Sequence, residues 1–293
     1  MSIFTCFGEV LWDVFPDHKK IGGAPLNVAL RLNAFGNDVS IISAIGNDNL
    51  GVQLTDYLKE NKLTSSNIQL KDNYQTGQVN VTLDSKGSAS YEIKSPTAWD
   101  NIEVNKQNLE QVRQSDVFIY GSLVCRNEVS KNTLFKLLEV AKFKVFDVNL
   151  RPPFFNFELI FEMMHSADFI KFNDEELELI LKELNQNFTS IEDKMTYISY
   201  TFNASHVCVT RGDKGAILLA NSNFYESLGF KIKVKDTVGA GDSFLATLLH
   251  KIINDKASNE AIDYACAVGA IVAASEGANP KILDEDIKLI MNN

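Results

Sequence analysis

The strongest constraint on the fold is a repeated alternation of short apolar segments with amphipathic helical ones. The helical segments carry hydrophobic residues at three- and four-residue spacing, and the apolar segments have the length of strands. This order predicts βαβ units and a mostly parallel sheet covered by helices on both faces. The predicted strands are 38–46, 116–123, 144–150 and 168–173, and the predicted helices are 22–36, 49–63, 131–141, 158–167 and 174–184.

Residues 77–94 interrupt this alternation. In GQVNVTLDSKGSASYEIK, apolar and polar residues alternate on either side of a DSKG turn signal at 84–87. The pattern predicts an antiparallel hairpin with one exposed face, which suits an edge ribbon, a dimer surface or a lid over a site. Because the sequence contains no internal repeat and no linker, we predict a single domain over residues 1–293 with a hairpin insertion at about 77–98.

The charge and the cysteines of the chain exclude several classes of protein. A formal net charge of −10 argues against nucleic acid as the main partner, because that binding needs clustered lysine and arginine. The 4 cysteines are widely separated, which indicates buried free thiols rather than a zinc site or a disulfide framework. The sequence shows neither a basic-apolar leader nor an apolar run of about 20 residues, so we expect a cytoplasmic protein with no membrane partner.

The segment KDTVGAGDSFLATLLH at 235–250 is the most informative motif. Gly239, Ala240 and Gly241 precede an apolar helical run, and such small residues let an anion approach the backbone N–H groups closely. Asp242 then places a carboxylate in the first helical turn. It either complements the helix dipole or acts as a base beside a group that becomes negative, as phosphoryl transfer requires. The sequence lacks the Walker phosphate loop and the dinucleotide fingerprint, which argues against a dinucleotide-dependent oxidoreductase.

Two segments together resemble the signatures of the ribokinase-like carbohydrate kinases. IGGAPLNVALRLNAFG at 21–36 resembles the N-terminal signature of that family, and DTVGAGDSF at 236–244 resembles the C-terminal one. The resemblance covers the whole chain and implies an α/β fold, with a mostly parallel central sheet flanked by helices and a small β lid formed by 77–98 and part of 8–20. It also implies ATP-dependent phosphorylation of a sugar hydroxyl, with Mg²⁺ and often a monovalent cation such as K⁺.

The resemblance assigns roles to the C-terminal signature. Asp242 is then the catalytic base, and Gly239, Ala240 and Gly241 line an anion hole for the transferring phosphoryl group. Asp236 is expected near the monovalent cation, where the plain structural alternative is a loop carboxylate or a helix cap.

Sugar contacts are expected from the N-terminal part of the chain and from one later loop. Asp13 ends the first apparent strand, where the ligands of open parallel sheets collect, and the resemblance places its carboxylate on acceptor hydroxyls. Gly22 and Gly23 permit a tight turn close to a ligand, and Asn27 can bond a hydroxyl through both ends of its amide. Arg151, in DVNLRPPFF, is expected near the sugar or the moving phosphoryl group, as in fructokinase-like members. The alternative for Asp13 is a solvated turn aspartate, and the alternative for the glycines and Asn27 is a helix start with an exposed asparagine.

Two further sequence segments are expected to contact the nucleotide or its metal ion. KFNDEE matches the family's Asn-x-x-Glu at Asn173 and Glu176, a pair that would organise Mg²⁺ and its waters. A helix cap at Asn173 explains the same residues. TRGDKGA resembles the strand end near the nucleotide, with Thr210 and Gly212 beside the phosphates or ribose and Arg211 as a candidate phosphate contact. A plain hairpin turn is the alternative there.

The acceptor is expected to be a neutral sugar. Family members that take phosphorylated sugars tend to have a lysine after the paired glycines, whereas this chain has Ala24. GGAPLNVA and GEVLWD resemble the fructokinase branch, which favours fructose, phosphorylated at its 6-hydroxyl, over ribose, 2-keto-3-deoxygluconate or a nucleoside. A sugar- or nucleotide-binding protein without turnover is the alternative class, and the presence of Asp242 speaks against it. The hairpin is also a candidate surface for a homodimer.

Overall fold

The computed structural model describes residues 2–83, 89–254 and 257–292. Its main sheet is built from β1 (Ile3–Phe7), β4 (Asp38–Gly46), β5 (Ile68–Lys71), β8 (Val117–Gly121), β9 (Lys144–Asp147), β10 (Phe169–Asn173), β11 (His206–Thr210), β12 (Ala216–Ala220) and β13 (Asn223–Ser227). These 9 strands lie in the order β13-β12-β11-β10-β9-β8-β1-β4-β5. All neighbours from β5 to β11 pair in parallel, and β12 and β13 join antiparallel, so the predicted mostly parallel sheet is confirmed.

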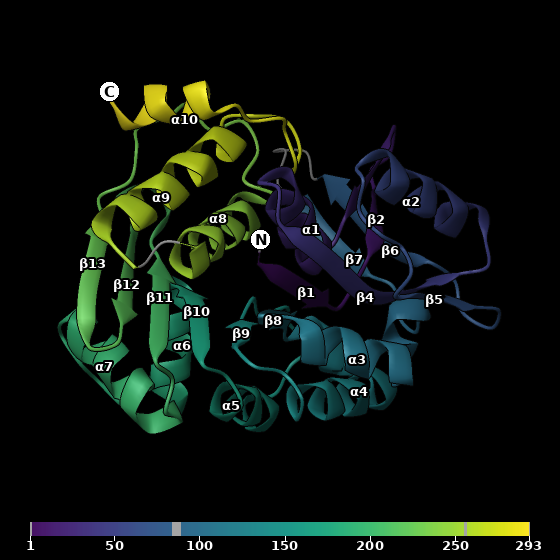
Figure 1. Cartoon of the computed structure of the whole chain (residues 1–293), viewed down its shortest axis with the longest axis horizontal. Coiled ribbons are helices and arrows are strands. Elements are labelled where there is room, and N and C mark those ends of the chain that lie inside the picture. The colour runs from purple at the N-terminus through teal and green to yellow at the C-terminus, as the bar shows by residue number, and fades with distance from the viewer. Residues whose placement is uncertain (1, 84–88, 255–256, 293) are drawn as a thin grey trace.

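Helices cover both faces of this sheet (Figure 1). One face packs against α1 (Ala24–Ala34), α2 (Asn49–Glu60), α8 (Ala240–Asn254) and α9 (Asn259–Ala273). The other packs against α3 (Lys106–Gln114), α4 (Glu128–Leu138), α5 (Phe157–His165), α6 (Asp174–Glu183) and α7 (Ile191–Phe202). The last helix, α10 (Asp284–Met291), packs on α9. No helix in the described ranges is long and apolar enough to cross a membrane.

Strand β8 shows why the strands of the main sheet appear in the sequence as continuous apolar runs. Side chains alternate between the two faces of a strand, and here Val117 and Ile119 enter one core while Phe118 and Tyr120 enter the other. All four are buried, as expected for a strand with helices on both sides.

The predicted elements form, but local backbone conformation moves some of their ends. The predicted helix at 22–36 begins at Ala24, because Gly23 has a φ of 113° and cannot be part of a right-handed helix. The predicted strand at 144–150 ends at Asp147, shortly before Asn149, which has a φ of 39°.

A second, smaller sheet lies beside the main one. It contains β2 (Leu11–Val14), β3 (Lys19–Gly22), β6 (Gly77–Leu83) and β7 (Ala89–Ile93), in the order β3-β2-β6-β7. The antiparallel pairing of β6 with β7 confirms the predicted hairpin, whose DSKG signal at 84–87 lies outside the described residues. Strands β2 and β6 pair in parallel, so segments from 11–22 and 77–93 form one unit, and its buried side chains Leu11, Val79 and Val81 share one cluster.

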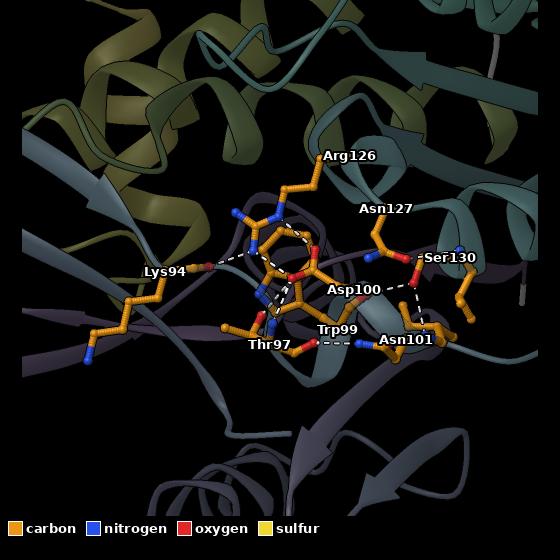
Figure 2. Close-up of polar contacts among 10 residues, drawn as sticks. Lys94, Thr97, Trp99, Asp100, Asn101, Arg126, Asn127 and Ser130 are labelled. Atoms are coloured by element: carbon orange, nitrogen blue, oxygen red, sulfur yellow. Dashed lines mark hydrogen bonds and ion pairs between the residues drawn. The ribbon is translucent and has the colours of Figure 1, made fainter. Parts of the chain in front are cut away.

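An ion pair anchors the return from the small sheet to the main body (Figure 2). The guanidinium of Arg126 donates to both carboxylate oxygens of Asp100, at 2.6 and 2.8 Å, and to the carbonyl of Lys94 at 2.6 Å. It also lies 3.9 Å from the ring centre of Trp99 and 4.9 Å from that of Phe154. The side chains of Arg126 and Asp100 are only 3% and 0% exposed, so this pair is shielded from water and held in one geometry.

Candidate active site

Helix α8 carries Asp242 in its first turn. The helix begins directly after Gly239, which is tightly packed. Gly239 has a φ of 77°, and a Cβ at this position would lie 2.4 Å from the Cβ of Ala278. Only glycine tolerates both that conformation and that approach. The N–H of Ala240 donates to the carbonyl of Thr237 at 3.2 Å, so the expectation of three open N–H groups at 239–241 is wrong for Ala240 in this structure.

The carboxylate of Asp242 is held by α1, which packs beside α8 (Figure 1). Asn27 donates its amide N–H to Asp242 Oδ2 at 2.8 Å. Burial raises the pKa of Asp242 to about 6, as does the nearby charge of Asp147, while the Asn27 hydrogen bond and the positive charges of Lys171 and Arg151 lower it. A carboxyl group with this pKa is ionised at neutral pH and can still take up a proton, which is what a general base needs.

A buried lysine lies beneath the first turn of α8. Lys171 Nζ donates to Asp147 Oδ1 at 2.8 Å, and the two side chains are 8% and 7% exposed. A Cβ on Gly241 would lie 3.5 Å from the same ammonium, so the positive charge stands next to the predicted anion hole. Burial alone would lower the pKa of Lys171, but the charges of Asp147 and Glu176 raise it, so the ammonium stays protonated.

A second acidic side chain, Glu9, lies in the turn between β1 and β2, close to the start of α1. Its pKa is raised to about 7, first by burial, and the N–H groups of Glu9 and Ala24 and the charge of Arg151 oppose that shift. Within the described residues, its Oε2 is buried without a hydrogen-bond partner. Gly23 packs against it, since a Cβ there would lie 2.4 Å from the Glu9 carbonyl oxygen. The charge of Asp242 also raises the pKa of Glu9, so the two carboxyl groups share one electrostatic environment.

Asp13 and Gly22, two of the predicted sugar contacts, lie side by side in the small sheet. Asp13 lies in β2 of the small sheet and not at the end of the first central strand, because the chain leaves β1 at Gly8, which has a φ of 147°. Its Oδ2 lies 2.6 Å from where a Cβ on Gly22 would be, so Gly22 keeps space for this carboxylate. Burial raises the pKa of Asp13 to about 6, and Lys20 lowers it.

The remaining two sugar-side predictions have different outcomes. Both ends of the Asn27 amide are engaged inside the protein, by Asp242 and by the amide of Asn279, which leaves one N–H of Asn27 for a hydroxyl. Arg151 is exposed, and its Nη1 donates to the carbonyl of Leu150 at 3.1 Å. Its charge reaches both Glu9 and Asp242, so it lies at the rim of the same site.

The predicted Mg²⁺ pair forms the helix cap that was its structural alternative. Asn173 Oδ1 accepts from the N–H of Glu176 at 2.7 Å, and Glu176 Oε2 accepts from the N–H of Asn173 at 2.9 Å. Glu176 Oε1 accepts from the N–H of Leu150 at 2.8 Å. Both carboxylate oxygens are thus in use, with further lone pairs left for water. The described residues contain no group of three or more His, Cys, Asp or Glu side chains that could hold a metal ion.

The residues predicted to contact the nucleotide in TRGDKGA lie at the C-terminal end of β11. The hydroxyl of Thr210 donates to the carbonyl of Phe172 at 3.3 Å, and Gly212, with a φ of 59°, begins the 3-10 helix η3 (Gly212–Lys214) between β11 and β12. Arg211 turns toward β13, where its Nη2 donates to Glu226 at 2.9 Å. Its charge is therefore paired within the protein, which disfavours the predicted phosphate contact.

Asp236 is a loop carboxylate. Its oxygens accept from the N–H groups of Val238 at 3.0 Å and Gly277 at 3.2 Å, and the ammonium of Lys20 lies 3.9 Å away. Asp236 thus links the segment before α8 to the loop after α9 and to β3 of the small sheet. The ammonium of Lys20 already places a positive charge beside Asp236. Asp236 therefore fits the role of a structural loop carboxylate at least as well as the role of a ligand for a monovalent cation.

Sequence reasoning missed three residues that the structure brings to this site. Lys171 carried a signal, because a lysine inside a buried parallel strand needs an ionic partner. Glu9 lies two residues after β1 and could have been noted as an acidic residue near a strand end. Asn279 carried no signal, since a single asparagine in an irregular segment is ordinary turn composition.

Comparison with known proteins decides the family. The model of the pfkB family of carbohydrate kinases matches residues 4–285, which is nearly the whole chain. The chain belongs to this family. The site at the start of α8 is accordingly the candidate active site of a pfkB carbohydrate kinase.

Relatives of this pfkB kinase include enzymes named for one sugar. A fructokinase of Solanum tuberosum is 30% identical over 99% of this chain and 95% of its own length. Among solved structures, fructokinase from Xylella fastidiosa with bound ATP is 20% identical, has a TM-score of 0.86 and aligns over 99% of this chain and 98% of its own. A double mutant of fructokinase from Vibrio cholerae, in a form with fructose, ADP and potassium ion bound, is 23% identical, with a TM-score of 0.84, over 99% of this chain and 98% of its own.

Proposed function

We propose that this kinase transfers the γ-phosphoryl group of ATP to the 6-hydroxyl of fructose, giving fructose 6-phosphate and ADP. The observation that carries the proposal is the position of Asp242. Its carboxylate stands in the first turn of α8, with a pKa of about 6, between a hydrogen-bond donor from Asn27 and the buried ammonium of Lys171. The names of the relatives support fructose as the acceptor.

The chemistry follows from these groups. The acceptor oxygen attacks the γ-phosphorus, the bond from that phosphorus to the bridging oxygen of ADP breaks, and the hydroxyl proton passes to Asp242. Lys171 and the helix N-terminus stabilise the negative charge on the moving phosphoryl oxygens. Arg151, at the exposed rim, adds a positive charge beside the incoming anion.

Mg²⁺ would enter with the nucleotide. Because the described side chains offer no metal-binding cluster, the ion would take its ligands from phosphate oxygens and water, as this ion prefers. Glu176 can hold one of these waters through a remaining lone pair and would thereby help to neutralise the phosphates. The ion supplies charge neutralisation on the nucleotide.

A neutral sugar fits the polar groups on the acceptor side. Asp13 and the free N–H of Asn27 provide an acceptor and a donor for hydroxyls, and Ala24 adds no cation for a sugar phosphate. We propose that the small sheet acts as the lid over this sugar, because it supplies Asp13 itself. Its edge strands β3 and β7 remain a candidate homodimer surface.

The test is phosphate transfer from ATP by the purified protein to fructose, ribose, 2-keto-3-deoxygluconate, adenosine and fructose 6-phosphate, with Mg²⁺ and K⁺ present. We expect the highest kcat/KM with fructose. Preference for another acceptor would keep the kinase and reject fructose as its substrate. Transfer to no acceptor would favour the binding-only alternative.

Replacing Lys171 with methionine is expected to lower kcat by about 10²–10³-fold, the range seen when one preorganised charge-stabilising donor is removed. The measurement is kcat at saturating ATP and fructose. The substitution also leaves Asp147 buried without its partner, so the Lys171→Met, Asp147→Asn double variant serves as control. It should regain thermal stability but not activity. An unchanged kcat in Lys171→Met would contradict the role in catalysis.

A further inference from the structure

A chain of two side-chain hydrogen bonds leads from Asp242 through Asn27 to the loop before α10. Asn27, on α1, donates to Asp242 Oδ2 at 2.8 Å. Asn279, in the loop between α9 and α10, donates to Asn27 Oδ1 at 2.8 Å. Three separate segments therefore meet at one carboxylate.

The direction of these bonds is fixed by chemistry. An ionised carboxylate only accepts hydrogen bonds, so the NH₂ end of the Asn27 amide must face Asp242. The oxygen of Asn27 then faces Asn279, which has to present its own NH₂ group. This leaves Asn279 Oδ1 buried without a partner among the described residues, an orientation that costs free energy.

The loop around Asn279 is held on both sides. Gly277 donates its N–H to Asp236, and the carbonyl of Pro280 accepts from Nη2 of Arg31 at 3.0 Å. Arg31 is itself buried on α1, and its Nε donates to the hydroxyl of Ser243, the residue after Asp242. The loop that carries Asn279 is thus held by α1 and by the segment before α8.

We propose that Asn279 is a positioning residue that fixes the amide orientation of Asn27 and so keeps a hydrogen-bond donor on the base Asp242. The proposal rests on the proposed role of Asp242 as base. Without Asn279, the Asn27 amide can rotate, and its oxygen can turn toward the carboxylate and repel it. The hydrogen bond favours the ionised base, so losing it raises the pH at which Asp242 takes up its proton.

The other charged groups around Asp242 stay in place when residue 279 changes. Glu9 faces Asp242 from the turn after β1, Asp147 from β9, Lys171 from β10 and Arg151 from the loop after β9. A neutral substitution at position 279 alters none of these charges. A shift in the titration of Asp242 would therefore report the hydrogen bond.

The experiment measures kcat against pH for the wild type and for Asn279→Leu, which has similar size and no hydrogen-bonding group. We expect the acid limb to move to higher pH by roughly half to one pH unit, the effect of one lost hydrogen bond to a carboxylate, with KM for ATP unchanged. The matched control is Asn33→Leu, which removes another α1 asparagine whose amide donates to the Asn61 carbonyl. It should leave the acid limb in place.

A double variant tests whether Asn279 acts through Asn27. In an Asn27→Ala background, Asn279→Leu should add no further shift, and an equal shift there would overturn the proposal. If the leucine variant does not fold, Asn279→Ala, which is also neutral and also lacks the amide, should produce a shift in the same direction. A wild type without phosphotransfer would reject the proposed function, whereas an active wild type whose acid limb matches that of Asn279→Leu rejects only the role of Asn279.

Discussion

Replacing Asp242 with asparagine is expected to lower kcat by about 10²–10⁴-fold, the range for loss of a general base, and at the same time to stabilise the folded protein. The folded-state pKa of Asp242 is about 6, above its ordinary value of 3.8. The folded state therefore binds this proton more tightly than the unfolded state, so stability falls as pH rises from about 4 to 6 and the full cost is present at neutral pH. Asparagine carries no charge, and removing this cost is worth up to about 3 kcal/mol.

Thermal unfolding at pH 7.5 and at pH 4, together with kcat, checks this expectation. The gain in Tm should be present at the higher pH and largely absent at the lower one, where the aspartate is protonated. Asp193→Asn is a matched control, because Asp193 occupies the same third position in the first turn of α7. If Asp242 only complements a helix dipole, as Asp193 does, both variants will lose a few tenths of a kcal/mol and keep their activity.

The second large effect is expected on folding. Replacing Arg126 with methionine leaves the Asp100 carboxylate buried without its ionic partner and should lower the free energy of unfolding by about 3–5 kcal/mol. It also removes the donor to the Lys94 carbonyl, where the chain leaves β7, and the cation above the Trp99 ring. Denaturant unfolding of wild type and variant measures the difference.

A surface ion pair provides the comparison for Arg126. Arg113 and Glu110 lie 3.0 Å apart on α3 with side chains 57% and 54% exposed, so Arg113→Met should cost less than about 1 kcal/mol. Adding Asp100→Leu to Arg126→Met should recover only part of the loss, because Asp100 also accepts from the N–H of Thr97 at 2.7 Å. Equal costs for Arg126→Met and Arg113→Met would show that the anchor of the small sheet contributes no more than a surface contact.

The sequence predicted what depends on local patterns. The alternation of strands and helices predicted the central sheet, because burial on both faces leaves a continuous apolar run such as VFIYG in β8. The motif around Asp242 predicted a carboxylate at the start of a helix, which the structure confirms. The hairpin at 77–94 was also visible from its alternation.

The sequence could not predict what depends on contacts between distant segments. Asp13 was assigned to the wrong strand, because the break at Gly8 depends on where the small sheet packs. The partner of Arg211 is on β13, and the partners of Asn27 are on α8 and in the loop before α10. Such pairings follow from the tertiary fold and leave no signal in spacing or composition.

The meeting of Asn27 with Asn279, which are 252 positions apart, has a consequence for protein synthesis. Translation begins at the N-terminus, and N-terminal parts of a chain fold first. The segment that completes the surroundings of Asp242 leaves the ribosome after both helices that carry Asn27 and Asp242. A growing chain can therefore build most of its sheet before the base is correctly surrounded. We expect chains released before residue 279 to lack the hydrogen bond to Asn27 and to be impaired in phosphotransfer.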